Sequence, residues 1–84
     1  MRAATEAMGV ALARLRIATD AVKQAREAHR IVSRKYEGGL ATVTDLFDAA
    51  ATETASDLAR EAAAYDAVVA RAELDKALGR EMTP

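Results

Sequence analysis

Residues 34–48 read RKYEGGLATVTDLFD, and they decide the fold because they contain the strongest break inside the chain. Gly38 and Gly39 are adjacent, and a pair of glycines favours a turn. Arg34 and Lys35 precede them, and cations are favourable in the last turn of a helix. Either glycine can supply the left-handed residue that commonly follows a helix. The stretch therefore predicts that a helix ends here.

A second helix is expected to begin directly after the glycines. Thr42 is a favoured N-cap residue, and Asp45 stands three positions later, as in an acidic variant of the capping box. Asp45 and Asp48 also place negative charge in the first turn, where the helix dipole favours it. Local chemistry thus accounts for the reversal of the chain without any further element.

The segments on both sides of the turn have helical periodicity. Apolar and small residues recur at alternating steps of three and four, which is typical of a coiled-coil seam. We expect the two seams to face each other. The first consists of Met8, Ala11, Leu15, Ala18, Val22, Ala25, His29, Val32 and Tyr36, and the second of Ala51, Ala55, Leu58, Ala62, Tyr65, Val69 and Ala72.

The predicted fold is all-α, an antiparallel two-helix coiled-coil hairpin. Its helices span residues 3–37 and 42–78, with a turn at 38–41 and an end at the Leu78-Gly79 pair. A lone hairpin with alanine-rich seams buries little apolar surface, since each methyl contributes about 0.8 kcal/mol. Other apolar residues lie off the seams and predict a second contact surface, through which the chain self-associates into a larger helical bundle: Val10, Ile17, Ile31, Val68 and Leu74.

Composition excludes several classes of protein. The chain has 84 residues, enough for one small domain, and alanine supplies 22 of its 43 apolar residues. Residues 1–37 hold eight basic and four acidic residues, a net charge of +4, whereas residues 38–84 hold four basic and nine acidic, a net of −5. The opposite charges of the two halves favour pairing between the two expected helices. The overall balance, a net charge of −1, argues against nucleic-acid binding.

No motif in the sequence indicates catalysis. There is no cysteine, and the one histidine, His29, has Arg26 three residues before it, where a di-metal carboxylate bundle needs Glu. Gly38 and Gly39 lack the Lys-Ser/Thr of a phosphate-binding loop. We therefore expect no enzyme activity, no metal site and no cofactor, with His29 a partly buried structural residue.

Three landmarks follow one another along the chain: the stretch from Tyr36 to Ala49, then Ala64-Tyr65-Asp66-Ala67, and finally Ala77-Leu78-Gly79. Their order and separation resemble the periplasmic hairpin of TolC-type outer-membrane efflux proteins. The resemblance covers about residues 24–79. Five residues depart from the family pattern: Gly38 before the turn glycine, Ala50 and Ala51 after Asp-Ala, and Ala64 and Ala67 near the tyrosine.

The resemblance implies that the chain is one hairpin of a larger trimeric channel in the cell outer membrane, with this segment in the periplasm. It implies that Gly38, Gly39 and Leu40 form the tip that docks a periplasmic adaptor, or membrane fusion, protein, and so serve an inner-membrane pump indirectly. It also implies that Asp45 and Asp48 line the pore entrance. The alternative is a freestanding structural coiled-coil hairpin that acts as an assembly or chaperone arm.

Overall fold

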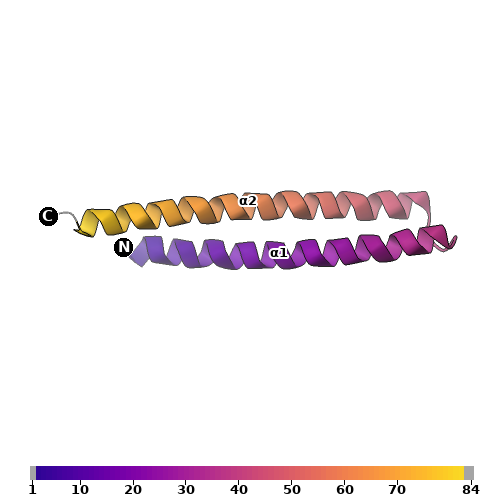
Figure 1. The fold of residues 1–84 in the computed structure, drawn as a ribbon, viewed down its shortest axis with the longest axis horizontal. Coiled ribbons are helices and arrows are strands. Elements are labelled where there is room, and N and C mark those ends of the chain that lie inside the picture. The colour runs from indigo at the N-terminus through magenta and orange to yellow at the C-terminus, as the bar shows by residue number, and fades with distance from the viewer. Residues whose placement is uncertain (1, 83–84) are drawn as a thin grey trace.

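The computed structural model describes residues 2–82, which form two long helices joined by a short turn (Figure 1). Helix α1 comprises Arg2–Glu37 and helix α2 comprises Val43–Met82. The helices lie side by side and antiparallel, and the Cα atoms span 70 × 13 × 13 Å. The predicted all-α helical hairpin is therefore confirmed.

The end of the second helix differs from the prediction. Helix α2 runs to Met82, so its predicted end at Leu78 is wrong by four residues. Gly79 lies within the helix and does not have the positive φ that a C-cap glycine adopts. A single interior glycine costs about 1 kcal/mol relative to alanine, which a helix of 40 residues tolerates.

The seam predicted for α1 is almost entirely correct. Ala11, Val22 and Ala25 are buried, and the other predicted members are half-buried except Tyr36, which is exposed. The buried residues alternate with larger half-buried side chains such as Met8 and Leu15 along the contact with α2. The heptad spacing of α1 therefore identified the face that packs.

The seam predicted for α2 is wrong, because all seven of its residues are exposed. The residues that face α1 lie two positions earlier, which is about 200° around the helix at 100° per residue. Leu74, which we expected off the seam, also belongs to this contact. The buried and half-buried residues of α2 at heptad spacing are Leu46, Ala49, Glu53, Ser56, Ala63, Ala67, Ala70, Leu74 and Ala77.

Hydrophobicity alone does not account for the face of α2 that meets α1. Alanine occurs on both faces, and the larger apolar residues Leu58 and Tyr65 lie on the face that stays exposed. The observed face brings Glu53 and Asp57 to Arg26 and His29 of α1, where they form ion pairs and hydrogen bonds. The alternative face has no charged residue at its seam positions, and the acids that border it are exposed.

The interior of the hairpin is thin. Among residues 2–79, five are buried and four of these are alanines: Ala11, Val22, Ala25, Ala67 and Ala70. The small side chains let the helix backbones approach closely and leave most large apolar side chains outside the contact. Neither helix, within residues 2–82, contains a stretch apolar and long enough to cross a membrane.

Candidate functional site: the hairpin tip and the outer face of α2

The tip is built on a Schellman motif that ends α1. The N–H of Leu40 donates to the carbonyl of Lys35 at 2.7 Å, and the N–H of Gly39 donates to that of Tyr36 at 3.0 Å. Gly39 has φ = 78°, the left-handed conformation at this position, so the choice between the two glycines is settled. Gly38 has an ordinary φ. All of Gly38, Gly39 and Leu40 are exposed.

A reciprocal capping box begins α2, as the sequence predicted. The hydroxyl of Thr42 accepts from the N–H of Asp45 at 3.1 Å, and Oδ2 of Asp45 accepts from the N–H of Thr42 at 3.0 Å. The carbonyl of Thr42 accepts the first helical bond, from the N–H of Leu46. Thr42 is therefore the N-cap, and the carboxylate of Asp45 has a structural role in the cap.

The two acids expected at a pore entrance have different surroundings. Asp45 and Asp48 are both exposed on the first turns of α2. Asp45 is engaged in the cap, whereas the carboxylate of Asp48 takes part in no hydrogen bond or ion pair within residues 2–82. The hydroxyl of Thr52 donates to the backbone carbonyl of Asp48, not to its side chain. Asp48 is thus the acid whose charge is available to solvent or ions.

The tip carries an apolar surface, of which sequence reasoning named Leu40 but missed Val43 and Phe47. Leu40 is 82% exposed and Phe47 is 67% exposed, and Val43 between them is also exposed. Val43 and Phe47, four residues apart, lie on one side of the start of α2, and Leu40 lies in the turn just before it. The signal in the sequence is the spacing of Val43 and Phe47, two large apolar residues four positions apart at the start of a helix. Here the tip presents large apolar side chains to water.

A polar cluster crosses from α1 to α2 one third of the way from the tip. His29 Nδ1 lies 2.6 Å from Oε2 of Glu53, and a carboxylate cannot donate, so the Nδ1–H of His29 donates. Arg26 lies 4.0 Å from Oε1 of Glu53 and 3.4 Å from Oδ1 of Asp57. Among the described residues these are the only ion pairs between the helices, so the expected pairing of a basic arm with an acidic arm is confined to this cluster.

Glu27 and Arg30 form an ion pair on the outside of α1. The carboxylate of Glu27 accepts from Nε of Arg30 at 3.0 Å and also from its terminal nitrogen. The hydrogen bond from Arg30 lowers the pKa of Glu27 below its ordinary value, with a smaller contribution from the charge of Arg34. The same hydrogen bond raises the pKa of Arg30. This pair does not reach α2 and is solvent-exposed.

The seam misassigned to α2 forms a continuous exposed face, called here the outer face of α2. Leu58 and Tyr65 are its largest members, 61% and 70% exposed, so the expected packing of Tyr65 in the interior is wrong. Most of the face turns away from α1, because its residues lie about 200° from those in the contact. Val69, 37% exposed, borders the groove between the two helices. It consists of Ala51, Ala55, Leu58, Ala62, Tyr65, Val69 and Ala72.

Helix α1 has a corresponding exposed stripe, called here the outer face of α1. Val10, Ile17 and Ile31 lie on it at intervals of seven or fourteen residues, all exposed, and Gln24 fills the intervening heptad. These include three of the five residues from which we expected a second contact surface. The smaller members of the stripe are Ala7, Ala21 and Ala28.

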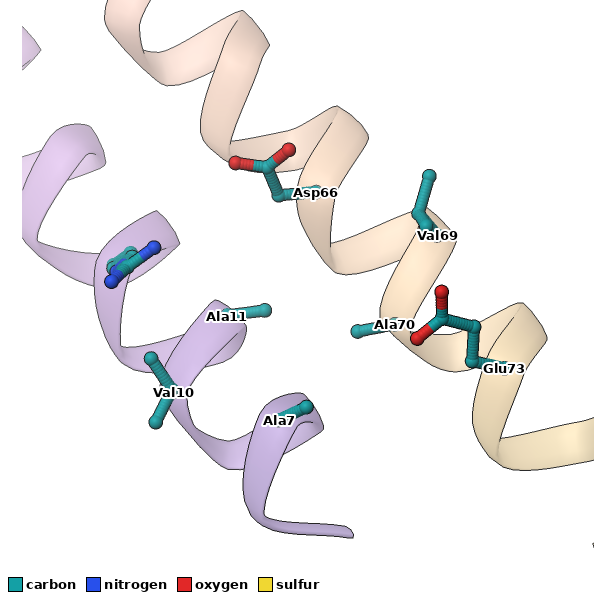
Figure 2. A pocket seen from close by; sticks show the side chains of 8 residues that line it. Ala7, Val10, Ala11, Asp66, Val69, Ala70 and Glu73 are labelled. Atoms are coloured by element: carbon teal, nitrogen blue, oxygen red, sulfur yellow. The ribbon is translucent and has the colours of Figure 1, made fainter. Parts of the chain in front are cut away.

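A shallow groove of about 340 Å³ lies between the helices near their free ends. Figure 2 shows the methyl groups of Ala11 and Ala70 directed toward each other at its floor. Val10 and Val69, which belong to the two outer faces, flank this floor, and the charged residues that line the groove are Arg14, Asp66 and Glu73. The groove is open to solvent and does not enclose a small molecule.

Within residues 2–82, no group of three or more His, Cys, Asp or Glu side chains is placed to hold a metal ion. His29 is half-buried, as expected, and its Nδ1 is occupied by Glu53.

Comparison with known proteins does not extend this description. No family model matches the chain, and neither a curated protein nor a solved structure is significantly similar to it. The function therefore has to be argued from the tip and the outer faces themselves.

Proposed function

We propose that this chain is a wall-and-tip segment of a helical duct, the periplasmic hairpin of a trimeric outer-membrane efflux or secretion channel of the TolC type. One observation carries the proposal: α2 has apolar faces on nearly opposite sides, and α1 covers only one of them. A helix of this kind is suited to a wall, in which each helix has a neighbour on both sides. The ordered landmarks from residue 24 to 79 add the resemblance to that family.

The tip is the part proposed to dock a periplasmic adaptor protein, and through it an inner-membrane pump. Gly38 and Gly39 have no side chains, which permits close approach of another backbone. Leu40 and Phe47 provide exposed apolar area beside them, and desolvated apolar side chains supply most of the affinity of a docking contact. The proposed role is passive, with no chemical step and no cofactor.

Asp45 and Asp48 are proposed to line the entrance of the duct. Threefold symmetry would repeat each carboxylate around the axis, and a ring of acids in a constriction attracts cations and disfavours anions. Because Asp45 also caps α2, Asp48 is the residue whose charge is proposed to act mainly on ions.

A chimaeric channel tests the proposal. Residues 24–79 replace the corresponding hairpin of a TolC-type channel, and export of a fluorescent dye is measured in cells that lack their own channel. We expect export to be restored and to be lost on Leu40→Asp, which changes an 82% exposed side chain that the fold does not need. Lys76→Asp is the matched control, since Lys76 is exposed on α2 far from the tip and its change should leave export intact.

Two outcomes would contradict the proposal. A folded, trimeric chimaera that does not export would favour the freestanding assembly or chaperone arm. Export that persists in the Leu40→Asp chimaera would remove the docking role of the tip while leaving the role in the wall.

A further inference from the structure

We propose that a second copy of this chain covers the outer face of α2, and that it does so with the outer face of its own α1. The inference rests on the proposed function in one respect. That function gives α2 a neighbouring helix on its exposed face, and the inference identifies this neighbour. It concerns the 84-residue chain itself, and its test needs no channel.

The two outer faces match in spacing and level. Within one hairpin, Ala11 packs with Ala67 and Ala70, and His29 bonds Glu53. Two residues at the same height along the hairpin axis, called here the same level, therefore have residue numbers that add to about 81. A copy lying alongside in the same orientation repeats this relation. Its Ile17 is then level with Tyr65 of the first copy, and both side chains are about 70% exposed in the single hairpin.

The same relation holds along the rest of the contact. Ile31 is level with Ala51, and Val10 is level with Ala72, so larger side chains of α1 meet smaller ones of α2 near both ends. This alternation is the arrangement that coiled-coil seams use to interdigitate. The contact between copies is then antiparallel, like the contact between α1 and α2 within one hairpin.

Charge selects α1 as the occupant rather than a second α2. Exposed acids border the outer face of α2, among them Glu61, Asp66 and Glu73, and none of these takes part in an ion pair within residues 2–82. Two such faces brought together would place like charges side by side. The segment containing α1 has a net charge of +4 and that containing α2 a net of −5, so contact between unlike helices is favoured.

The proposed contact joins two different surfaces, so it does not close after two copies. Each copy that uses its α1 still has an outer face of α2 available for another copy. Interfaces of this kind produce rings where the rotation closes and open rows where it does not. The chain should therefore form assemblies larger than dimers at high concentration.

Cysteine pairing under reversible oxidation tests the inference, because the chain contains no cysteine of its own. Ile17→Cys is prepared with ¹⁵N and Tyr65→Cys without it, and the two are mixed at millimolar concentration in a glutathione buffer. Mass spectrometry then separates the mixed disulfide from the two self-disulfides. Random pairing makes the mixed disulfide twice as abundant as each self-disulfide; we expect an excess of roughly tenfold, which corresponds to about 1.4 kcal/mol.

The matched control is Leu12→Cys mixed with Tyr65→Cys. Leu12 is also apolar and exposed, but it lies about 140° around α1 from Ile17. This mixture should give random pairing. A second variant, Tyr65→Glu, should lower the average mass measured by sedimentation equilibrium, and its helix content by circular dichroism should be unchanged.

Random pairing of Ile17→Cys with Tyr65→Cys, an excess of the Tyr65 self-disulfide, or unchanged association of Tyr65→Glu would each overturn the inference. A chimaera that exports despite such a result would leave the proposed function standing. If the mixed disulfide is in excess but a folded chimaera does not export, the inference about the contact between copies holds and the proposed function does not.

Discussion

Nδ1 of His29 lies 2.6 Å from Oε2 of Glu53, and this contact joins α1 to α2 within a seam that is otherwise mostly alanine and aliphatic. Both side chains are about one third exposed, so the interaction is partly shielded from water. A polar contact at one level of a seam penalises other registers, because a shift would separate the partners. In this hairpin it also selects which face of α2 meets α1.

Removal of one partner of this pair should destabilise the hairpin. We expect His29→Leu or Glu53→Leu alone to lower the free energy of unfolding by about 1 kcal/mol, since each leaves a half-buried polar group without its partner. The double variant should recover the loss or exceed the wild type, because an apolar pair needs no desolvation of charge. Urea unfolding at one fixed protein concentration measures this, and additive losses in the double variant would show that the two residues do not interact.

The two turn glycines should respond differently to alanine. Gly39→Ala should cost about 1 kcal/mol because φ = 78° is unfavourable for a residue with a Cβ atom. Gly38→Ala is the matched control: its Cβ would lie 3.6 Å from the carbonyl of Arg34, an ordinary contact, and stability should stay the same or rise. Thermal melting followed by circular dichroism compares them. Equal melting temperatures for the two variants would contradict the assignment of Gly39 as the left-handed residue.

Loss of the cap should weaken the start of α2. Thr42→Ala removes the acceptor for the N–H of Asp45 and should cost about 1 kcal/mol. Thr44→Ala changes the same residue type within the first turn, where no side-chain hydrogen bond is at stake, and should alter stability by less than about 0.5 kcal/mol. Hydrogen exchange at Asp45 and Leu46 provides a local readout, and unchanged protection in Thr42→Ala would be inconsistent with the capping box.

The pKa of Glu27 should depend on Arg30. The hydrogen bond from Arg30 lowers this pKa from an ordinary value of 4.5, so Arg30→Gln should raise it. Because the folded-state pKa is lowered, the pair's contribution to stability is present above the unfolded-state pKa and is lost as pH falls through the folded-state value. An NMR titration of the Glu27 carboxyl measures the shift, with Arg16→Gln as a control that should leave it unchanged.

In the chimaeric channel, Asp45→Asn combined with Asp48→Asn should reduce cation selectivity and relieve block by multivalent cations. Asn retains an oxygen that can accept from the N–H of Thr42, so the cap should survive. Since Asp48 is not engaged in the cap, Asp48→Asn alone should account for most of the change. Bilayer conductance is the measurement, and selectivity equal to that of the unmodified chimaera would leave the acids with a local role at the helix start.

The parts of the structure that local chemistry determines were predictable from sequence. The pair of glycines predicts a left-handed residue after α1, and Gly39 adopts that conformation. Thr42 and Asp45, three residues apart, form the cap of α2 without help from any other part of the chain. The packing face of α2 was not predictable from periodicity, because Leu58 and Tyr65 mark one face while Glu53 and charge pairing select the other. Similarly, Gly79 reads as a terminator locally, yet α2 continues to Met82.

The rod is 70 Å long and 13 Å wide, so each residue touches only others at its own level along the axis. Loss of contact at one level removes few contacts at distant levels, as in linear arrays of structural repeats. Unfolding should therefore advance as a fraying front from the end that carries both termini, where alanine contacts such as that of Ala11 with Ala70 hold the helices together. The ion pairs and the hydrogen bond of Arg26 and His29 with α2 should slow this unfolding, because they must break before the helices separate further. The section between them and the tip is then the last to separate.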